Sequence, residues 1–265
     1  MRKSWHAIHF APAGRGFPSV RGRHLAGIAA LALLGAGAQS EVRAQGWGGA
    51  LGIASDNIDR GYSLSAGRPA WLADLHYEFG PEWLIGLSAS AERPRRQEPG
   101  ARLAVYIDRR WRVDDVWAAK AGVVHYDSPW NAWRRPLRYD EINVAIGYRD
   151  RWRATLAVSP NTPERYLYPY RRARSGFAAW PELTFHQPIV GRLSADIGVG
   201  YAYRQHAGDR NYGYGNVGIS YAIGDTYLYL SRLWTNSVAP PYGWNGYSLE
   251  SESRGRWVAS VVWSF

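Results

Sequence analysis

The residues of this sequence that could do covalent chemistry are few and scattered. Cysteine is absent, so no disulfide, thiolate nucleophile or thiolate metal ligand is available. The histidines after residue 44 are His76, His125, His186 and His206. Only His125 has Asp127 and Ser128 beside it, the side-chain types of a hydrolytic triad, but no G-x-S-x-G motif surrounds this serine. We expect no catalytic residue, metal or cofactor, and keep lipid hydrolysis as an alternative.

A second group of polar residues could act without covalent chemistry, because charged side chains recur at every second position between apolar ones. Asp74 stands between Ala73 and Leu75, and Asp108 follows Ile107. In a strand this spacing places the ions on one face, and ions that line a lumen select solutes by charge and size. The candidates for such a lining are Asp74, Arg102, Asp108, Arg110, Lys120, Glu141, Arg153, Glu182 and Asp196. The alternative is that they pair with one another and plug the lumen.

Glycines on the same face, namely Gly86, Gly147 and Gly198, are expected to leave room for a solute. A further cluster lies in the segment SDNIDRGYS, residues 55–63, which holds Asp56, Asp59 and Arg60. There Arg60 could meet an anionic solute at the mouth of a pore or fold inward as a constriction. Equally, the segment could be a turn-rich loop whose Asp and Asn side chains satisfy backbone groups.

The elements that would position these residues are strands, because the two-residue alternation recurs along the whole chain after residue 44. Each segment is close to the 9 to 11 residues of a tilted membrane-crossing strand. The predicted strands are 46–55, 69–79, 83–91, 101–111, 116–126, 139–148, 151–159, 176–187, 192–203, 212–222, 226–234 and 255–265. A soluble sandwich would alternate in the same way, so the connections must decide.

The connections alternate in length. Short turns fall at 80–82, 112–115, 149–150, 188–191 and 223–225, whereas long polar stretches fall at 56–68, 92–100, 127–138, 160–175 and 235–254. Short turns on one side and long loops on the other are typical of outer-membrane barrels. The sequence therefore predicts an all-β fold, an antiparallel transmembrane barrel of about twelve strands formed by residues 45–265.

The two ends of the chain fit export to an outer membrane. Residues 1–44 contain basic residues, then the apolar run LAGIAALALLGAGA, and are expected to be a cleaved signal peptide. The last predicted strand ends on Phe265, with Trp257, Val261 and Trp263 on the same face. This resembles the carboxy-terminal signature of bacterial outer-membrane proteins, in which the final aromatic residue is recognised by the barrel-assembly machinery.

Composition excludes one partner class and favours a membrane interface. Six of the 32 Lys and Arg and one of the 22 acids fall in residues 1–44, which lowers the net charge from +10 to +5. The remaining charges of both signs are interspersed, so no basic face for nucleic acid is expected. The 14 Trp and 18 Tyr are instead the residue types that membrane interfaces enrich.

The stretches SDNIDRGYSLSAGRPAWLADLHYEFGPEWLIGLSAS and YDEINVAIGYRDRWRATLAVSP resemble the proteobacterial TorF-type porin family. The likeness rests on Ser55, Asp56, Arg60, Gly61, Ser63, Pro69, Ala70, Tyr139, Glu141, Ser159 and Pro160. The Arg-rich stretch 93–102 and the segment WNAWRRP fit the family less well. The resemblance implies a porin-type barrel and brings no established substrate or catalytic residue.

Together these features predict a porin-like channel in the Gram-negative outer membrane that passes small hydrophilic solutes or ions by passive diffusion. Its expected partners are outer-membrane lipid, the barrel-assembly machinery and the solutes. Besides lipid hydrolysis, a plugged structural or adhesive barrel stays open, because Trp130, Trp133 and Trp244 and the tyrosines at 166, 168 and 170 fall in long loops where they could bind partners.

Overall fold

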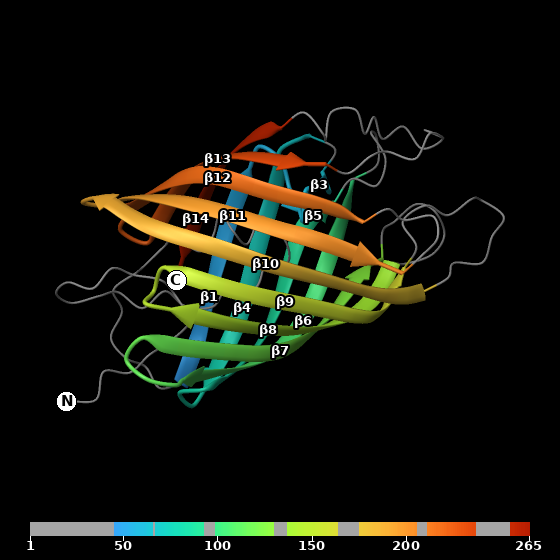
Figure 1. The fold of residues 1–265 in the computed structure, drawn as a ribbon, viewed down its shortest axis with the longest axis horizontal. Helices are drawn as coiled ribbons and strands as arrows, with labels where there is room; N and C mark the ends of the chain where they lie inside the picture. The colour runs from blue at the N-terminus through green and yellow to red at the C-terminus, as the bar shows by residue number, and fades with distance from the viewer. Residues whose placement is uncertain are drawn as a thin grey trace.

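The computed structural model describes residues 45–65, 67–92, 99–129, 137–163, 175–205, 211–236 and 255–265. Twelve of its strands form one closed barrel in the order β1-β14-β13-β12-β11-β10-β9-β8-β7-β6-β5-β4. Every neighbouring pair is antiparallel (Figure 1). The predicted fold class and strand number are confirmed. The expected signal peptide, residues 1–44, lies outside the described residues, as do the loop aromatics at 130, 133, 166, 168, 170 and 244.

The barrel strands match the twelve predicted segments in number and order. They are β1 (Gln45–Ala54), β4 (Ala70–Phe79), β5 (Trp83–Glu92), β6 (Gly100–Arg112), β7 (Trp117–Ser128), β8 (Leu137–Tyr148), β9 (Trp152–Pro163), β10 (Ser175–Val190), β11 (Leu193–Arg204), β12 (Tyr212–Ile223), β13 (Thr226–Thr235) and β14 (Arg256–Ser264). Two further strands, β2 (Ile58–Asp59) and β3 (Tyr62–Ser63), form a separate hairpin inside the first long connection. Among the described residues no helix is long and apolar enough to cross a bilayer.

The largest error in the predicted bounds is at the end of β9, which runs on to Pro163 where the sequence predicted an end at 159. A second error concerns β10, which runs on to Val190 where the sequence predicted a turn at 188–191. The strand register shifts between Pro188 and Val190, so the strand absorbs the proline at an irregular position. Proline lacks the N–H that a regular strand ladder needs, which explains why the sequence predicted a turn at Pro188. The turn itself is shorter, and Gly191 holds the positive φ of 57° that it requires.

The two faces of each strand differ as the alternation predicts. Apolar side chains such as Val105, Val144 and Ile197 point outward and are 43 to 48% exposed. Charged side chains such as Asp74, Asp108 and Glu141 point inward and are at most 4% exposed. A surface of this kind is stable in hydrocarbon, because a closed barrel leaves no unpaired sheet edge and turns its apolar side chains to the lipid.

Aromatic residues gather at both ends of the outer face. On the short-turn side they are Phe79, Trp83, Trp117, Trp152, Trp263 and Phe265, and on the long-loop side Trp71, Phe177, Tyr203, Trp234 and Trp257. Trp111, at the short-turn end of β6, is half-buried. Two aromatic girdles around an apolar band match the two interfaces of a membrane.

The turn between β8 and β9 is one of the short connections, with three residues between the strands. Arg149 and Asp150 have φ of 51° and 53°, and the Arg151 N–H donates to the Tyr148 carbonyl at 3.1 Å. Two consecutive positive φ angles give a type I′ turn, whose twist matches that of the strands. Burial raises the pKa of Asp150 to about 6, although the nearby charge of Arg112 acts in the opposite direction.

We predict that the stability of the barrel depends on pH through Asp150. Because the folded barrel favours the protonated form of Asp150, stability present below pH about 4, the ordinary Asp pKa, should be lost as the pH rises through 6. The variant Asp150→Asn should therefore raise the urea midpoint at pH 8 more than at pH 3.5. Asn also tolerates positive φ, but that gain is the same at both pH values. An equal shift at the two pH values would contradict the prediction.

Inward glycines make room for tyrosine rings rather than for open space at two positions. A Cβ added at Gly86 would lie 2.4 Å from the Cζ and Oη atoms of Tyr106, and one at Gly200 would lie 2.4 Å from the ring of Tyr214. The expectation that Gly86 leaves room for a solute is therefore wrong, because Tyr106 from the neighbouring strand fills that space.

Gly86→Ala should consequently destabilise the barrel by about 1 to 3 kcal/mol, the usual range for overpacking. Tyr106 cannot move cheaply, since it is buried and its hydroxyl donates to Asp74 Oδ2 at 2.6 Å. Gly213→Ala is the matched control, because its added Cβ would have no neighbour closer than 3.7 Å. Urea unfolding of the refolded chain measures both, and equal effects would contradict the packing argument.

The barrel closes between β1 and β14, and Phe265 takes part in the seam. Its N–H donates to the Gly49 carbonyl and its carbonyl accepts from the Gly49 N–H, each at 3.0 Å. The Phe265 ring lies over Gly49, where an added Cβ would come within 2.6 Å of it. The terminal aromatic therefore contributes to closure, while its role as an assembly signal stays a prediction.

Candidate functional site

The first long connection folds back into the lumen, and we call residues 56–65 the luminal hairpin. Its strands β2 and β3 pair Ile58 with Ser63 and Asp59 with Tyr62. At the tip, Arg60 and Gly61 have φ of 48° and 83°. Non-glycine residues rarely adopt positive φ, so the contacts of the Arg60 side chain must hold it there.

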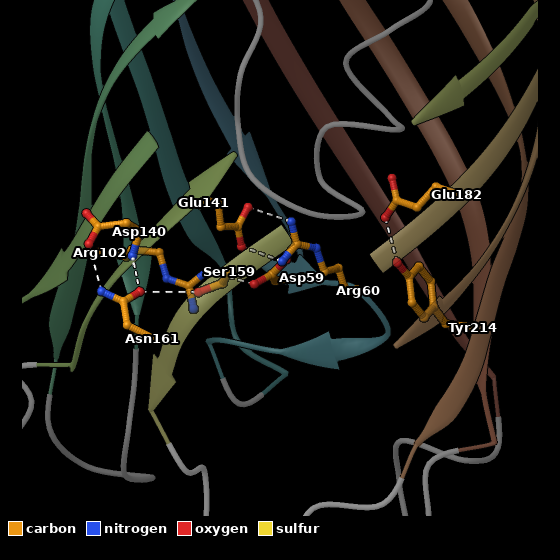
Figure 2. A network of polar contacts seen from close by, with 9 residues as sticks. All are labelled: Asp59, Arg60, Arg102, Asp140, Glu141, Ser159, Asn161, Glu182 and Tyr214. Carbon is orange, nitrogen blue, oxygen red and sulfur yellow. Dashed lines mark hydrogen bonds and ion pairs between the residues drawn. The ribbon is translucent and has the colours of Figure 1, made fainter. Parts of the chain in front are cut away.

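The Arg60 side chain forms the central contact of the hairpin. Its guanidinium donates to both carboxylate oxygens of Glu141 on β8, at 2.6 and 2.8 Å (Figure 2). It also lies over the ring of Trp180 on β10, 4.0 Å from the ring centroid. The side chains of Arg60 and Glu141 are 8% and 0% exposed. Such a bidentate, buried ion pair fixes both the position and the orientation of the Arg60 side chain.

The other predicted loop residues hold the hairpin to further strands. Asp59 Oδ2 accepts from Arg102 on β6 at 2.7 Å (Figure 2). Arg102 also lies 3.9 Å from Glu92. Asp56 accepts from the hydroxyls of Ser63 and Ser65 at 2.6 and 2.7 Å, and pairs with Arg256 on β14. Asp56 therefore joins the serines of the hairpin to β14, whereas Asp59 and Arg60 pair with β6 and β8.

The hairpin also touches the strands on the opposite side of the lumen. Tyr62 packs edge-on against Tyr212 on β12, with ring centroids 4.8 Å apart. A Cβ added at Gly61 would come within 2.9 Å of Tyr214 and 3.0 Å of Thr235. The hairpin therefore reaches from β8 to β12 and β13 and narrows the lumen on the long-loop side.

A second group of predicted residues forms ion pairs in the half of the lumen nearer the short turns. Lys120 Nζ lies 3.5 Å from Asp108 Oδ1. Arg110 lies 3.2 Å from Glu78, which was not among the candidates. Asp74 accepts from Tyr106 at 2.6 Å and contacts His76 Nδ1 at 2.8 Å. These side chains come from β4, β6 and β7 and are all buried.

The remaining three candidates lie on the other wall. Asp196 contacts His186 Nδ1 at 2.6 Å and accepts from Ser220 at 3.2 Å. Glu182 accepts from the Tyr214 hydroxyl at 2.7 Å (Figure 2). Arg153 makes no ion pair within 4.0 Å among the described residues. All nine candidates therefore lie on the inner side of the barrel. Seven of them have an ionic or His partner, and two, Arg153 and Glu182, have none among the described residues.

The lumen wall divides into two sectors of different chemistry. From β4 to β11 the inward face carries every candidate charge. From β12 through β13 and β14 to β1, the described inward residues are Tyr, Asn, Gly, Ser, Thr, Leu, Val and Ala, apart from Arg256 at the start of β14. A solute in the lumen would thus meet ions on one side and hydroxyls, tyrosine rings and small side chains on the other.

Several residues of the site were missed from the sequence. Trp180 stands two residues before Glu182 and hence on the same face, so the alternation could have found it. Tyr214 likewise alternates within its predicted strand. Arg204 and Arg256 are inward-facing residues at strand ends, where predicted bounds are least reliable.

The hydrolytic constellation is not assembled. His125 is exposed on the outer face and pairs with Asp140 at 2.7 Å, whereas Ser128 is buried on the inner face. Residues three apart in a strand point to opposite sides, so they cannot form a dyad. No group of three or more His, Asp or Glu that could hold a metal ion occurs in the part of the chain that the structure describes.

A closed twelve-stranded barrel with an apolar, aromatic-girdled exterior and an ionic interior has the architecture of outer-membrane barrels. No protein-family model matches the sequence, and no curated protein matches it. The barrel is similar to a chain solved in work on the in-meso crystallisation of membrane proteins, with a TM-score of 0.51 and 12% identity over 83% of each chain. At this identity the likeness shows the fold alone.

Two other solved structures have lower TM-scores. The KdgM porin has a TM-score of 0.48 and 12% identity over 82% of this chain and 99% of its own. The CymD monoaromatic hydrocarbon channel has a TM-score of 0.43 and 9% identity, over 83% of this chain and 88% of its own.

Proposed function

We propose that this chain is a porin-like channel of the outer membrane, through which small hydrophilic solutes or ions diffuse passively. The observation that carries the proposal is the inward-folded hairpin inside an ion-lined, closed barrel. Eight strands enclose a side-chain-filled interior and sixteen or more an aqueous channel, so twelve suit a narrow conduit. The Arg60–Glu141 pair then makes the hairpin a fixed constriction.

A plugged structural barrel is the first alternative, because the hairpin reaches both sides of the lumen and most of the candidate ions are paired. The sector from β12 to β1 favours the channel. There the inward side chains other than Arg256 are uncharged, and apart from the buried tyrosines at 212, 214, 227 and 229 they are mostly small, so no ionic network crosses that side on the short-turn side of the hairpin. The passage would run along this sector.

Lipid hydrolysis is the second alternative, and the opposite orientations of His125 and Ser128 argue against it. In this proposal the protein is not an enzyme. Its lipid contacts are the outward band and the two girdles, and its assembly uses the terminal strand with Phe265.

The finer family assignment and the processing of the chain belong to the same proposal. Residues of the TorF-type resemblance, including Asp56, Arg60 and Ser63, build the luminal hairpin, and Glu141 is the partner of Arg60. Their joint position in the luminal hairpin and at its contact with β8 supports membership of that family. Residues 1–44 would be removed as the signal peptide before the barrel inserts.

Osmotic swelling of lipid vesicles tests this function. Vesicles that contain the refolded chain, residues 45–265, should swell rapidly in isotonic glycerol and more slowly in glucose and sucrose, because a narrow conduit excludes by size. Vesicles with folded barrel that swell no faster than empty ones would support the plug instead. Release of fatty acid from the vesicle lipid, abolished by Ser128→Ala, would support the hydrolase.

A further inference from the structure

Arg153 differs from four other basic side chains that face the lumen. Arg60, Arg102, Arg110 and Lys120 each have a carboxylate within 4.0 Å. Arg153 has none among the described residues, and its Nε is enclosed without an acceptor. Its terminal nitrogens are not enclosed in this way, so they keep unused hydrogen-bond donors that face the lumen.

Glu182 carries an unpaired charge of opposite sign beside it. Thr184 is the register partner of Arg153 and Thr155 that of Glu182, so the two charged residues are diagonal neighbours on the inner face of β9 and β10. Diagonal neighbours lie about 7 to 8 Å apart at the backbone, within reach of long side chains. They do not pair here, because Glu182 is turned toward the Tyr214 hydroxyl (Figure 2).

A third polar group completes the arrangement. The register continues from Thr184 to Gly198 on β11 and from Gly198 to Asn216 on β12, so Asn216 lies in the same row as Arg153. Asn216 is 2% exposed, and its amide has no hydrogen-bond partner in the part of the chain that the structure describes. Between them lie Thr184 on β10 and Gly198 on β11, and Gly198 contributes no side chain.

We propose that Arg153, Glu182 and Asn216 form a solute-binding site for zwitterions, that is, for small molecules with a carboxylate and an ammonium group a few ångströms apart, such as α-amino acids. The guanidinium binds the carboxylate with two hydrogen bonds, and Glu182 binds the ammonium. The Asn216 amide completes the hydrogen bonds over Gly198. The uncharged part of the solute faces the wall from β12 to β1, whose inward side chains are uncharged apart from Arg256. The site rests on the proposed channel as the route by which solute arrives.

The charge arrangement favours a zwitterion over a simple anion. An anion at Arg153 would be attracted by Arg110 but repelled by the carboxylates of Glu182 and Asp108, which lie in electrostatic range. An ammonium at Glu182 would be attracted by Asp59 but repelled by Arg153 and Arg60. A solute that carries both charges places its carboxylate against Arg153 and its ammonium against Glu182, so each of these two side chains gains a partner of opposite charge.

Ligand-observed NMR titration of the refolded barrel in detergent tests the site independently of conduction. The probes are leucine, 4-methylpentanoate, which lacks the ammonium, and isoamylamine, which lacks the carboxylate. Leucine should bind at least about tenfold more tightly than either analogue, since each charge-assisted contact contributes roughly that factor. Arg153→Gln and Glu182→Gln should each weaken leucine binding by about tenfold, while Arg192→Gln in an exposed turn should leave it unchanged.

Glu182→Gln keeps an acceptor for Tyr214, so it is the variant least able to disturb folding. The inference is overturned if wild-type barrel does not bind leucine, if 4-methylpentanoate binds as well as leucine, or if both variants bind leucine like the wild type. Binding of leucine by a barrel that passes no current would keep the site and remove the channel. Current without leucine binding would keep the channel and remove the site.

Discussion

Replacing Arg60 with alanine is expected to lower the free energy of unfolding by about 3 to 5 kcal/mol and to raise the conductance of the channel. Removal of one partner of a buried ion pair leaves the other charge uncompensated, and this cost is typical. Here the remaining partner would be Glu141, whose side chain is fully buried. The hairpin would also lose its contact with β8 and with the ring of Trp180, so the lumen should widen.

The double variant Arg60→Ala/Glu141→Ala provides the control. It removes both charges, so its loss of stability should be smaller than that of Arg60→Ala alone, while its conductance should stay high. Urea unfolding and single-channel recording measure the two effects. Equal conductance in wild type and both variants would mean that the hairpin does not constrict the conducting path.

The second large effect concerns the outer face. Val105→Arg is expected to destabilise the barrel by about 2 to 4 kcal/mol, the cost of an arginine on the lipid side near the bilayer midplane. Val105 lies in the middle of β6 and is 47% exposed on the outer face.

Val113→Arg is the matched control, because Val113 is 65% exposed in the turn after β6, where the same change should cost about 0 to 1 kcal/mol. Folding into lipid vesicles at increasing urea measures both. Equal costs at the two positions would contradict the placement of β6 across the membrane.

The sequence was sufficient to predict the strands and their faces, because the two-residue period is a local signal. Leu103, Val105 and Ile107 alternate with a second set of residues that begins at Arg102 and ends at Asp108, whatever the rest of the chain does. A closed barrel requires no more than this pattern and alternating loop lengths. The pairing of His125 with Ser128 could not be excluded in this way, because Ser128 fell in the predicted loop 127–138. The structure extends β7 to Ser128, which places the two side chains on opposite faces.

The hairpin could not be predicted in the same way. The turn residues of SDNIDRGYS are equally suited to a loop that points outward, and its inward position depends on Glu141, 81 residues away in the sequence. The two irregular positions in β10, near Gly176 and Pro188, are likewise set by pairing with β9 and β11.

Which inward charges pair was also beyond the sequence. Glu182 and Arg153 share a face, but their side chains diverge because Tyr214 from two strands away binds the carboxylate. The space beside Gly86 depends in the same way on Tyr106 from the next strand, so a glycine alone does not indicate an opening.

Single-channel recording of the refolded chain in a planar lipid bilayer tests the central claim most directly. A barrel whose interior conducts along the uncharged sector beneath the hairpin should give discrete, reproducible current steps in KCl, and larger steps in Arg60→Ala/Glu141→Ala. The absence of current steps in bilayers that contain folded and inserted barrel would contradict the proposed channel.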